Sequence, residues 1–352
     1  MIYENLEFFN VDHLDYVPGM SGMRLERFPG HFRYKLGNEQ NRNGRFRAER
    51  AHGCEIRFVT EAKYFDVALS AVEEDMNICV YYGDMLHEVH RLKAGICTVL
   101  HVEQPEMYKF VEAEKLIGKR FAPYVWRIQF GMNGFAYFHY VDTFGQSIRP
   151  PKETEKPSIS WVAYGSSITC GSVTSLYSNC YIEQTALRLG AEVMNKGLSG
   201  SCFCEPMAVD YMASVEARMV SLEVGVNMIQ MFDEEEFEAR ISYLLKRMKE
   251  SMAERIYVID MFPNKGLLLK DHQEPYYQRY RSFRKIWKEK MEKVEDKRFV
   301  HIDGEVVAKD FSYLSTDLLH PSDHGHILMG ENLAAIIKAE EEDRGGNIFG
   351  TL

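Results

Sequence analysis

The sequence has no apolar segment long enough to cross a membrane and no segment with the form of a secretory signal. No uninterrupted apolar stretch approaches the ~20 residues that a spanning helix needs. The N-terminus, Met1-Ile-Tyr-Glu-Asn-Leu-Glu7, lacks a basic segment followed by an apolar one. These absences argue against an integral membrane protein and predict a soluble, cytoplasmic protein with no membrane partner.

The chain has fewer basic than acidic residues. The chain has 42 Lys and Arg residues against 52 Asp and Glu residues, which gives a formal net charge of -10. Phosphate binding needs a basic face, so nucleic acid is excluded as a general partner. The one basic run, residues 279–290, has apolar residues at helical spacing. This pattern predicts the solvated side of an amphipathic helix rather than a binding patch.

A disulfide framework is also absent. The seven cysteines are odd in number and irregularly spaced, which predicts free thiols in a reducing compartment. In contrast, apolar residues make up 45% of the chain and aromatic residues 12%, which is enough for packed cores. The length of 352 residues suggests two domains, or one large one.

Residues 1–150 have the sequence pattern of an antiparallel sheet. Short runs in which apolar and polar residues mostly alternate are separated by turn residues, and this spacing predicts a jelly-roll-like β-sandwich domain. The expected strands are 54–60, 65–70, 77–82, 125–130 and 135–141. Tyr81, Tyr82 and Trp126 lie on these strands, where they either stack on sugar rings or, for at least half of them, pack in the core.

A proline-rich, charged segment at 149–157 is expected to be a linker to a second domain, 151–352. After it, strand and helix patterns alternate, which predicts a parallel sheet covered by helices on both faces. The expected strands are 159–164, 191–196, 219–224, 255–260 and 298–302, and the expected helices are 178–189, 205–213, 233–252, 274–294 and 325–341.

The first of these strands ends at Gly165-Ser-Ser-Ile-Thr169. Ligands bind at the carboxyl ends of the strands in open α/β sheets, so a serine here is a candidate nucleophile, and we favour Ser167. The alternative is that Ser166 and Ser167 only cap the following helix.

Two later strand ends have residues suited to stabilising an oxyanion. Asn195-Lys-Gly-Leu-Ser-Gly-Ser201 contains glycines that allow a ligand to approach backbone N–H groups closely. Glu223-Val-Gly-Val-Asn227 ends in a neutral amide that can donate a hydrogen bond. An ordinary turn and a helix cap are the alternatives.

The last loop, residues 315–326, contains a carboxylate and an imidazole three residues apart, Asp317 and His320. Acyl transfer needs a base for the serine proton and a carboxylate that orients that base. Asp323, His324 and His326 raise the alternative of a metal site. We disfavour it, because Pro321 and Gly325 interrupt any regular helical face and no HExxH motif is present. His326 is expected to pack locally at the start of the last helix.

Together, four stretches resemble the SGNH hydrolases, the GDSL-like esterase superfamily. They are Gly165-Ser-Ser-Ile-Thr169, Gly197-Leu-Ser-Gly200, Gly225-Val-Asn227 and Asp317-Leu-Leu-His-Pro321, in the family's order over about residues 158–340. The resemblance implies a flavodoxin-like three-layer α/β/α catalytic domain. It also implies Ser167 as nucleophile, His320 as base and Asp317 as its orienter, with an oxyanion hole formed by the backbone N–H groups of Ser167 and Gly200 and the side-chain amide of Asn227.

One position departs from the family pattern. The family usually has Asp before the nucleophile, where this chain has Ser166. Variants with Gly-Ser-Ser resemble a branch of the superfamily that has a β-sandwich ahead of the catalytic domain, and that branch includes sugar-ester deacetylases and acyltransferases.

We therefore expect a carboxylic ester hydrolase, a serine esterase that removes small acyl groups, O-acetyl groups in particular, from carbohydrates through an acyl-enzyme. Its partner is a small-molecule acyl ester such as an acetylated sugar, contacted in part by the sandwich. No cofactor and no metal are expected, and homo-oligomerisation stays open. The alternatives are an acyltransferase with the same triad and a catalytically inert sugar-binding protein.

Overall fold

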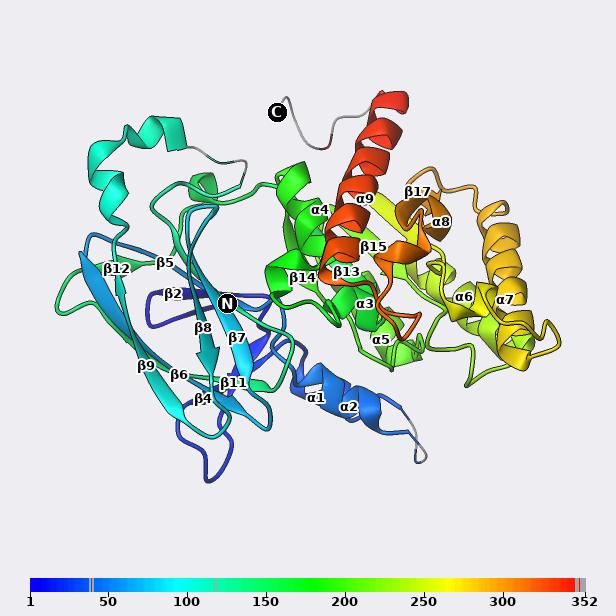
Figure 1. Ribbon diagram of the computed structural model, residues 1–352, viewed down its shortest axis with the longest axis horizontal. Helices are drawn as coiled ribbons and strands as arrows, with labels where there is room; N and C mark the ends of the chain where they lie inside the picture. Colours follow the sequence, from blue (N-terminus) through cyan, green and yellow to red (C-terminus); the bar gives the residue numbers. More distant parts are fainter. Residues whose placement is uncertain (38, 40, 117, 119, 346–347, 349–352) are drawn as a thin grey trace.

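The structure is a computed structural model that describes residues 1–37, 39, 41–116, 118, 120–345 and 348. Antiparallel sheets occupy the N-terminal part of the chain, and a parallel sheet flanked by helices occupies the C-terminal part (Figure 1). Both parts of the predicted fold class are confirmed.

Two antiparallel sheets form the sandwich. One has the order β1 (Ile2–Tyr3), β2 (Leu6–Phe9), β5 (Glu55–Thr60), β10 (Trp126–Phe130), β7 (Met76–Tyr82) and β8 (Met85–Leu92), with β12 (Ile148–Arg149) also pairing with β5. The other has the order β3 (His13–Asp15), β4 (Met23–Glu26), β11 (Phe135–Asp142), β6 (Tyr64–Val72) and β9 (Cys97–Glu103). Alternate side chains of both sheets enter one core, which includes Phe58 and Phe65 with their rings edge to face.

The C-terminal sheet is parallel and five-stranded. Its order is β14 (Glu192–Asn195), β13 (Ser160–Gly165), β15 (Met219–Glu223), β16 (Arg255–Ile259) and β17 (Phe299–Ile302). This is the expected flavodoxin-like order. The strands are buried on both faces, which explains why they read as nearly continuous apolar runs.

Helices cover both faces of this sheet. They are α3 (Ser167–Cys170), α4 (Tyr181–Leu189), α5 (Pro206–Ser214), α6 (Glu234–Met248), α7 (Pro275–Met291), α8 (Gly304–Val307) and α9 (Asp323–Asp343). Helices α4 and α9 contribute to one core, and α5, α6 and α7 to the other (Figure 1). The basic run lies on α7, whose buried residues are Tyr280, Phe283 and Trp287, so its amphipathic character is confirmed.

Several helix ends differ from the predicted bounds, by up to four residues, and two of them have a clear local cause. Helix α9 begins at Asp323, two residues before Gly325, because the Ser322 side chain accepts a hydrogen bond from the Gly325 N–H at 3.1 Å and caps the helix. Helix α6 ends at Met248, where the Ser251 hydroxyl donates to the Met248 carbonyl. The predicted end at Met252 is wrong, and Met252 is exposed.

A segment of the N-terminal part enters the C-terminal core. It includes the short helices α1 (Gly30–Arg33) and α2 (Asn43–Ala48), and Figure 1 shows both (blue) on the side of the sandwich that faces α5. Phe28, Phe32 and Leu36 are buried in the same core as Tyr164 and Leu198. The division of the chain into units 1–150 and 151–352 stays a prediction.

The segment that joins the two parts is fixed. Arg149 donates two hydrogen bonds to the carboxylate of Glu155, at 2.7 and 2.8 Å, and Glu155 also accepts the Lys152 N–H. A one-turn 3₁₀ helix, η3 (Glu153–Glu155), follows Lys152. The expected linker is therefore a structured connection. The two parts also contact each other through Phe28, Phe32 and Leu36, which are buried in the C-terminal core.

Candidate active site

The turn after β13 separates the roles of the two serines. Ser166 is the N-cap of α3, and its hydroxyl accepts the Ile168 N–H at 3.2 Å. Ser167 is the first residue of α3, and its Oγ lies 2.8 Å from Nε2 of His320. Capping is thus the role of Ser166, and the Ser167 hydroxyl is left for another partner.

The three predicted catalytic side chains form a hydrogen-bonded chain. His320 lies between Ser167 and Asp317, with its Nδ1 2.6 Å from Oδ2 of Asp317. A carboxylate beside Nδ1 keeps the ring proton there, so Nε2 is free to accept the serine proton. Ser167 is only 6% exposed, whereas Asp317 lies near the surface. These distances and partners suit the predicted roles of a nucleophile, a base and an orienting carboxylate.

The loop of Asp317 is organised by its carboxylate. Oδ1 accepts three hydrogen bonds at 2.9 Å, from the Ser315 hydroxyl and from the backbone N–H groups of Leu319 and His320. Burial by itself would raise the pKa of Asp317, but these donors and the His320 ring lower it well below its usual range. Asp317 therefore stays ionised while it orients the imidazole.

The three predicted oxyanion donors follow three adjacent strands, β14, β13 and β15. Among the hydrogen bonds of the described residues, neither the Ser167 N–H nor the Gly200 N–H has a protein acceptor. Gly200 has a φ of +64°, a conformation that favours glycine. Asn227 Oδ1 accepts the Cys202 N–H at 3.1 Å, which orients the amide so that its NH₂ group can donate. A shared oxyanion hole stays a prediction.

Sequence reasoning missed a buried carboxylate behind the turn. Glu223, the last residue of β15, is 1% exposed, and its Oε2 accepts the Ser166 N–H, the Ser166 hydroxyl and the Thr169 hydroxyl. Burial raises the pKa of Glu223 to about 7, although these donors lower it in part. The signal in the sequence was a charged residue at the end of an otherwise uncharged buried strand.

The other residues of the last loop are structural. His326 is buried and bonds distant partners rather than local ones: its Nδ1 accepts the Tyr181 N–H and its Nε2 donates to the Ser172 carbonyl. Burial lowers the pKa of His326 to about 4. Asp323 accepts hydrogen bonds from Ser175 and Asn179. Within the described ranges, no group of three or more His, Cys, Asp or Glu side chains is arranged to hold a metal ion.

Two cysteines near the triad and three aromatic residues of the sandwich lie in the interior. Cys170 and Cys202 are buried, and burial raises the pKa of the Cys170 thiol to about 12. Tyr81, Tyr82 and Trp126 are at most 8% exposed, and Tyr82 and Trp126 pack in the sandwich core, whereas the Tyr81 ring lies against the Arg127 guanidinium. None of these three rings presents a face to a sugar.

No helix in the described part of the chain is both long and apolar enough to cross a membrane.

The sequence matches no curated protein at a significant level. Many solved structures share the fold, among them the following three. A salicylyl-acyltransferase, SsfX3, from a tetracycline biosynthetic pathway is 17% identical with a TM-score of 0.77, over 96% of this chain and 95% of that chain.

The other two structures are esterases. A family two carbohydrate esterase from Clostridium thermocellum, in complex with cellohexaose, is 15% identical with a TM-score of 0.59, over 83% of this chain and 94% of that chain. An acetyl xylan esterase, Est2A, from the rumen bacterium Butyrivibrio proteoclasticus is 11% identical with a TM-score of 0.52, over 82% and 90%. The model of the GDSL-like lipase/acylhydrolase family matches residues 158–338, which contain all four loops, and the chain therefore belongs to this family.

Proposed function

We propose that this protein is a serine esterase that hydrolyses small acyl esters, O-acetyl esters of carbohydrates in particular. The observation that carries the proposal is the chain of hydrogen bonds from Ser167 Oγ through His320 to Asp317, with spacings of 2.8 and 2.6 Å. Two hydrogen bonds of this length align a hydroxyl, a base and an orienting group for acyl transfer.

In the proposed mechanism, Ser167 Oγ attacks the ester carbonyl while His320 Nε2 takes its proton. The tetrahedral oxyanion accepts hydrogen bonds from the Ser167 and Gly200 N–H groups and the Asn227 amide. The imidazolium, stabilised by Asp317, then returns the proton to the departing alcohol and leaves an acyl-serine. Water, deprotonated by the same imidazole, attacks this acyl group and releases the carboxylic acid.

An acyltransferase is the second candidate, because an alcohol can replace water in the last step without any change to the triad. The acyltransferase SsfX3 shares this fold, which supports acyl transfer to an alcohol as an alternative to hydrolysis. An inert sugar-binding protein is the third candidate. The intact hydrogen-bonded triad speaks against it, since a binding module has no need to align a serine with an imidazole.

The sandwich contributes to a polar cleft beside the loop that follows α3. This cleft of about 350 Å³ is lined by Asn77, Arg91 and Asn133 of the sandwich and by Val173–Ser175 of the loop. Asn77 Nδ2 donates to the Ser175 carbonyl at 3.0 Å, and the Ser172 N–H donates to the Ser167 carbonyl at 3.0 Å. We propose that the sandwich contacts the polyhydroxylated alcohol part of the substrate here.

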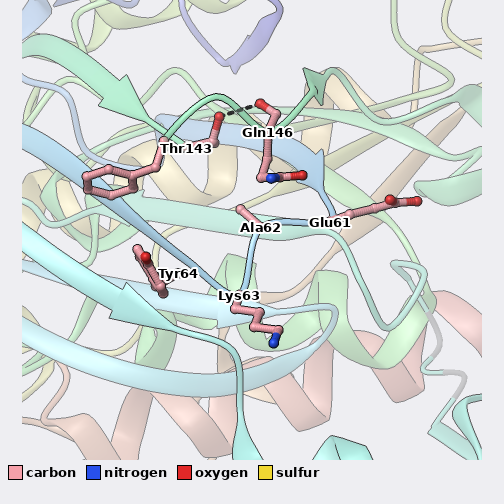
Figure 2. Close-up of a pocket in the computed structure, with 7 residues that line it drawn as sticks. Glu61, Ala62, Lys63, Tyr64, Thr143 and Gln146 are labelled. Carbon is pink, nitrogen blue, oxygen red and sulfur yellow. Dashed lines mark hydrogen bonds between the residues drawn. The ribbon is translucent and has the colours of Figure 1, made fainter.

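A second pocket lies at the far end of the sandwich, between the turns after β5 and β11 (Figure 2). It has a volume of about 270 Å³, and Glu61, Lys63 and Gln146 line it together with two aromatic residues. Tyr64 and Phe144 are 44% and 50% exposed, with ring centroids 5.3 Å apart. We propose that these rings, rather than the buried ones considered from sequence, provide the apolar surface on which a sugar stacks.

Labelling with a fluorophosphonate tests the nucleophile. The wild-type protein should be labelled at Ser167 and should hydrolyse p-nitrophenyl acetate, and a folded Ser167→Ala variant should do neither. Labelling that persists in Ser167→Ala would refute the assignment. Release of acetate with and without added saccharides then separates the candidates, because an acyltransferase transfers acetyl to the saccharide and an esterase does not.

A further inference from the structure

The carboxylate of Glu223 holds the turn that carries Ser167 on both sides of that residue. Its Oε2 accepts the Ser166 N–H at 2.8 Å, the Ser166 hydroxyl at 2.7 Å and the Thr169 hydroxyl at 3.1 Å. Oε1 is buried and has no hydrogen-bond partner in the described part of the chain. All three observed hydrogen bonds are therefore directed at the residues that flank Ser167.

The sheet fixes the position of this carboxylate. Glu223 on β15 pairs in register with Gly165 on β13, directly before the two serines. A Cβ added to Gly165 would lie 2.8 Å from Glu223 Oε2 and 2.2 Å from Thr169 Oγ1. Glycine is thus required at residue 165 because the carboxylate and the threonine approach the backbone so closely.

The far side of the turn is held as well. The Thr169 hydroxyl lies 2.9 Å from the Tyr181 hydroxyl, and Asn195 Nδ2 donates to the Thr169 carbonyl at 2.8 Å. Each of these partners comes from a different element, α4 and β14. At a pH above its pKa of about 7, Glu223 is the charged member of this set, and hydrogen bonds to a charged acceptor are roughly twice as strong as neutral ones.

We propose that Glu223 is the positioning residue of the nucleophile turn and supplies, from the neighbouring strand, the carboxylate that Ser166 does not have. The proposal rests on Ser167 as nucleophile. Glu223 touches no reacting atom; it acts by fixing the backbone of the turn, and so the direction of the Ser167 hydroxyl and N–H. Its loss should lower the rate of acylation and leave substrate affinity nearly unchanged.

The first test is Glu223→Gln, which keeps the shape and one acceptor but removes the charge. At about pH 8, where Glu223 is ionised, we expect kcat for p-nitrophenyl acetate and the rate of fluorophosphonate labelling to fall roughly 10-fold, with KM within about threefold of wild type. Both rates are measured well below the melting temperature of the variant. Unchanged rates in folded Glu223→Gln would overturn the proposal.

The second test moves the carboxylate. In Ser166→Asp, a second carboxylate faces Glu223 and the hydroxyl donor is lost, so we expect a loss of more than tenfold. In Ser166→Asp/Glu223→Gln, the Gln amide can donate to the new Asp, and activity should exceed that of Ser166→Asp at least tenfold. A double variant whose loss equals the product of the two single losses would contradict the proposal.

Glu341→Gln is the matched control. Glu341 is also a buried carboxylate with one unpartnered oxygen, but it bonds Arg255 and Tyr257, away from the nucleophile turn. This variant should lower thermal stability without changing kcat. If Glu223→Gln does not fold, the double variant decides: a folded, active protein supports the carboxylate swap and an unfolded one overturns it. Failure of wild-type labelling would instead refute the proposed function.

Discussion

Asp317 holds His320 through both of its carboxylate oxygens: Oδ2 lies 2.6 Å from the ring Nδ1, and Oδ1 accepts the backbone N–H of the same histidine at 2.9 Å. The residue that orients the imidazole therefore also folds the loop that presents it. Substitutions in this loop affect chemistry and local structure together, and the first prediction uses this double role.

Asp317→Asn should abolish nearly all turnover with little loss of fold. The Ser315, Leu319 and His320 donors keep the amide oxygen at the Oδ1 position. The amide NH₂ then faces Nδ1 of His320, so the ring proton must move to Nε2. A protonated Nε2 cannot accept the proton of Ser167. We expect kcat to fall roughly 10³–10⁴-fold. Ester hydrolysis by folded protein measures this, with Ser315→Ala as the control that weakens the loop but preserves the tautomer.

Asn227→Ala should lower kcat about 100–1000-fold, the usual effect of losing one oxyanion donor. The protein should remain folded, because Asn227 is only half-buried and makes one hydrogen bond, with the Cys202 N–H. Asn227→Asp separates the two contributions, since it keeps that acceptor and removes the donor. Near wild-type turnover in folded Asn227→Ala would remove this residue from the active site.

Arg27→Met should destabilise the protein and slow acylation together. The Arg27 guanidinium is fully buried and donates to the carbonyls of Asn195 and Gly197, at 2.7 and 3.3 Å, and to those of Arg47 and Arg50. Its removal takes one donor from each of these carbonyls, at a cost of about 3 kcal/mol or more. Asn195 ends β14 and Gly197 lies in the loop after it, so two of the lost hydrogen bonds hold the segment that leads to Gly200.

Urea denaturation and the rate of fluorophosphonate labelling measure the two effects of Arg27→Met. Arg281→Met is the control, because Arg281 is exposed on α7, and its free energy of unfolding should stay within about 0.5 kcal/mol of wild type. A wild-type labelling rate in destabilised Arg27→Met would show that the loop does not need this arginine.

The stability of Glu223→Gln relative to wild type should depend on pH. The folded protein keeps the Glu223 proton up to a pKa of about 7, whereas the unfolded chain releases it near the ordinary value of 4.5. The folded state therefore binds more protons across this interval, and wild-type stability falls as the pH rises. Between pH 4.5 and pH 8, the free energy of unfolding of Glu223→Gln should rise by roughly 3 kcal/mol relative to that of wild type. Chemical denaturation at a series of pH values measures it; parallel curves would contradict the raised pKa.

The order of elements and the main candidates for catalysis could be predicted from the sequence. Alternating strand and helix patterns predicted the parallel sheet, because buried strands and amphipathic helices have different hydrophobic periods. Ser167, Asp317 and His320 could be picked out as candidates because they lie in segments between a strand and the next long helix, and parallel strands bring such segments to one edge. Their chemistry depends on residue type and short spacing, which a sequence displays directly.

The contacts between strands and loops that are distant in sequence could be identified only from the folded chain. The order of the sheet sets Glu223 of β15 beside Ser166 after β13, a pairing that no local pattern contains. The entry of Phe28–Leu36 into the C-terminal core follows from packing across the two parts, and the exposure of Tyr64 rather than Tyr81 follows from where each ring lies in the folded chain. Contacts between residues far apart in sequence are set by shape and burial, so the contacts that hold the turn of Ser167 are seen only in the folded chain.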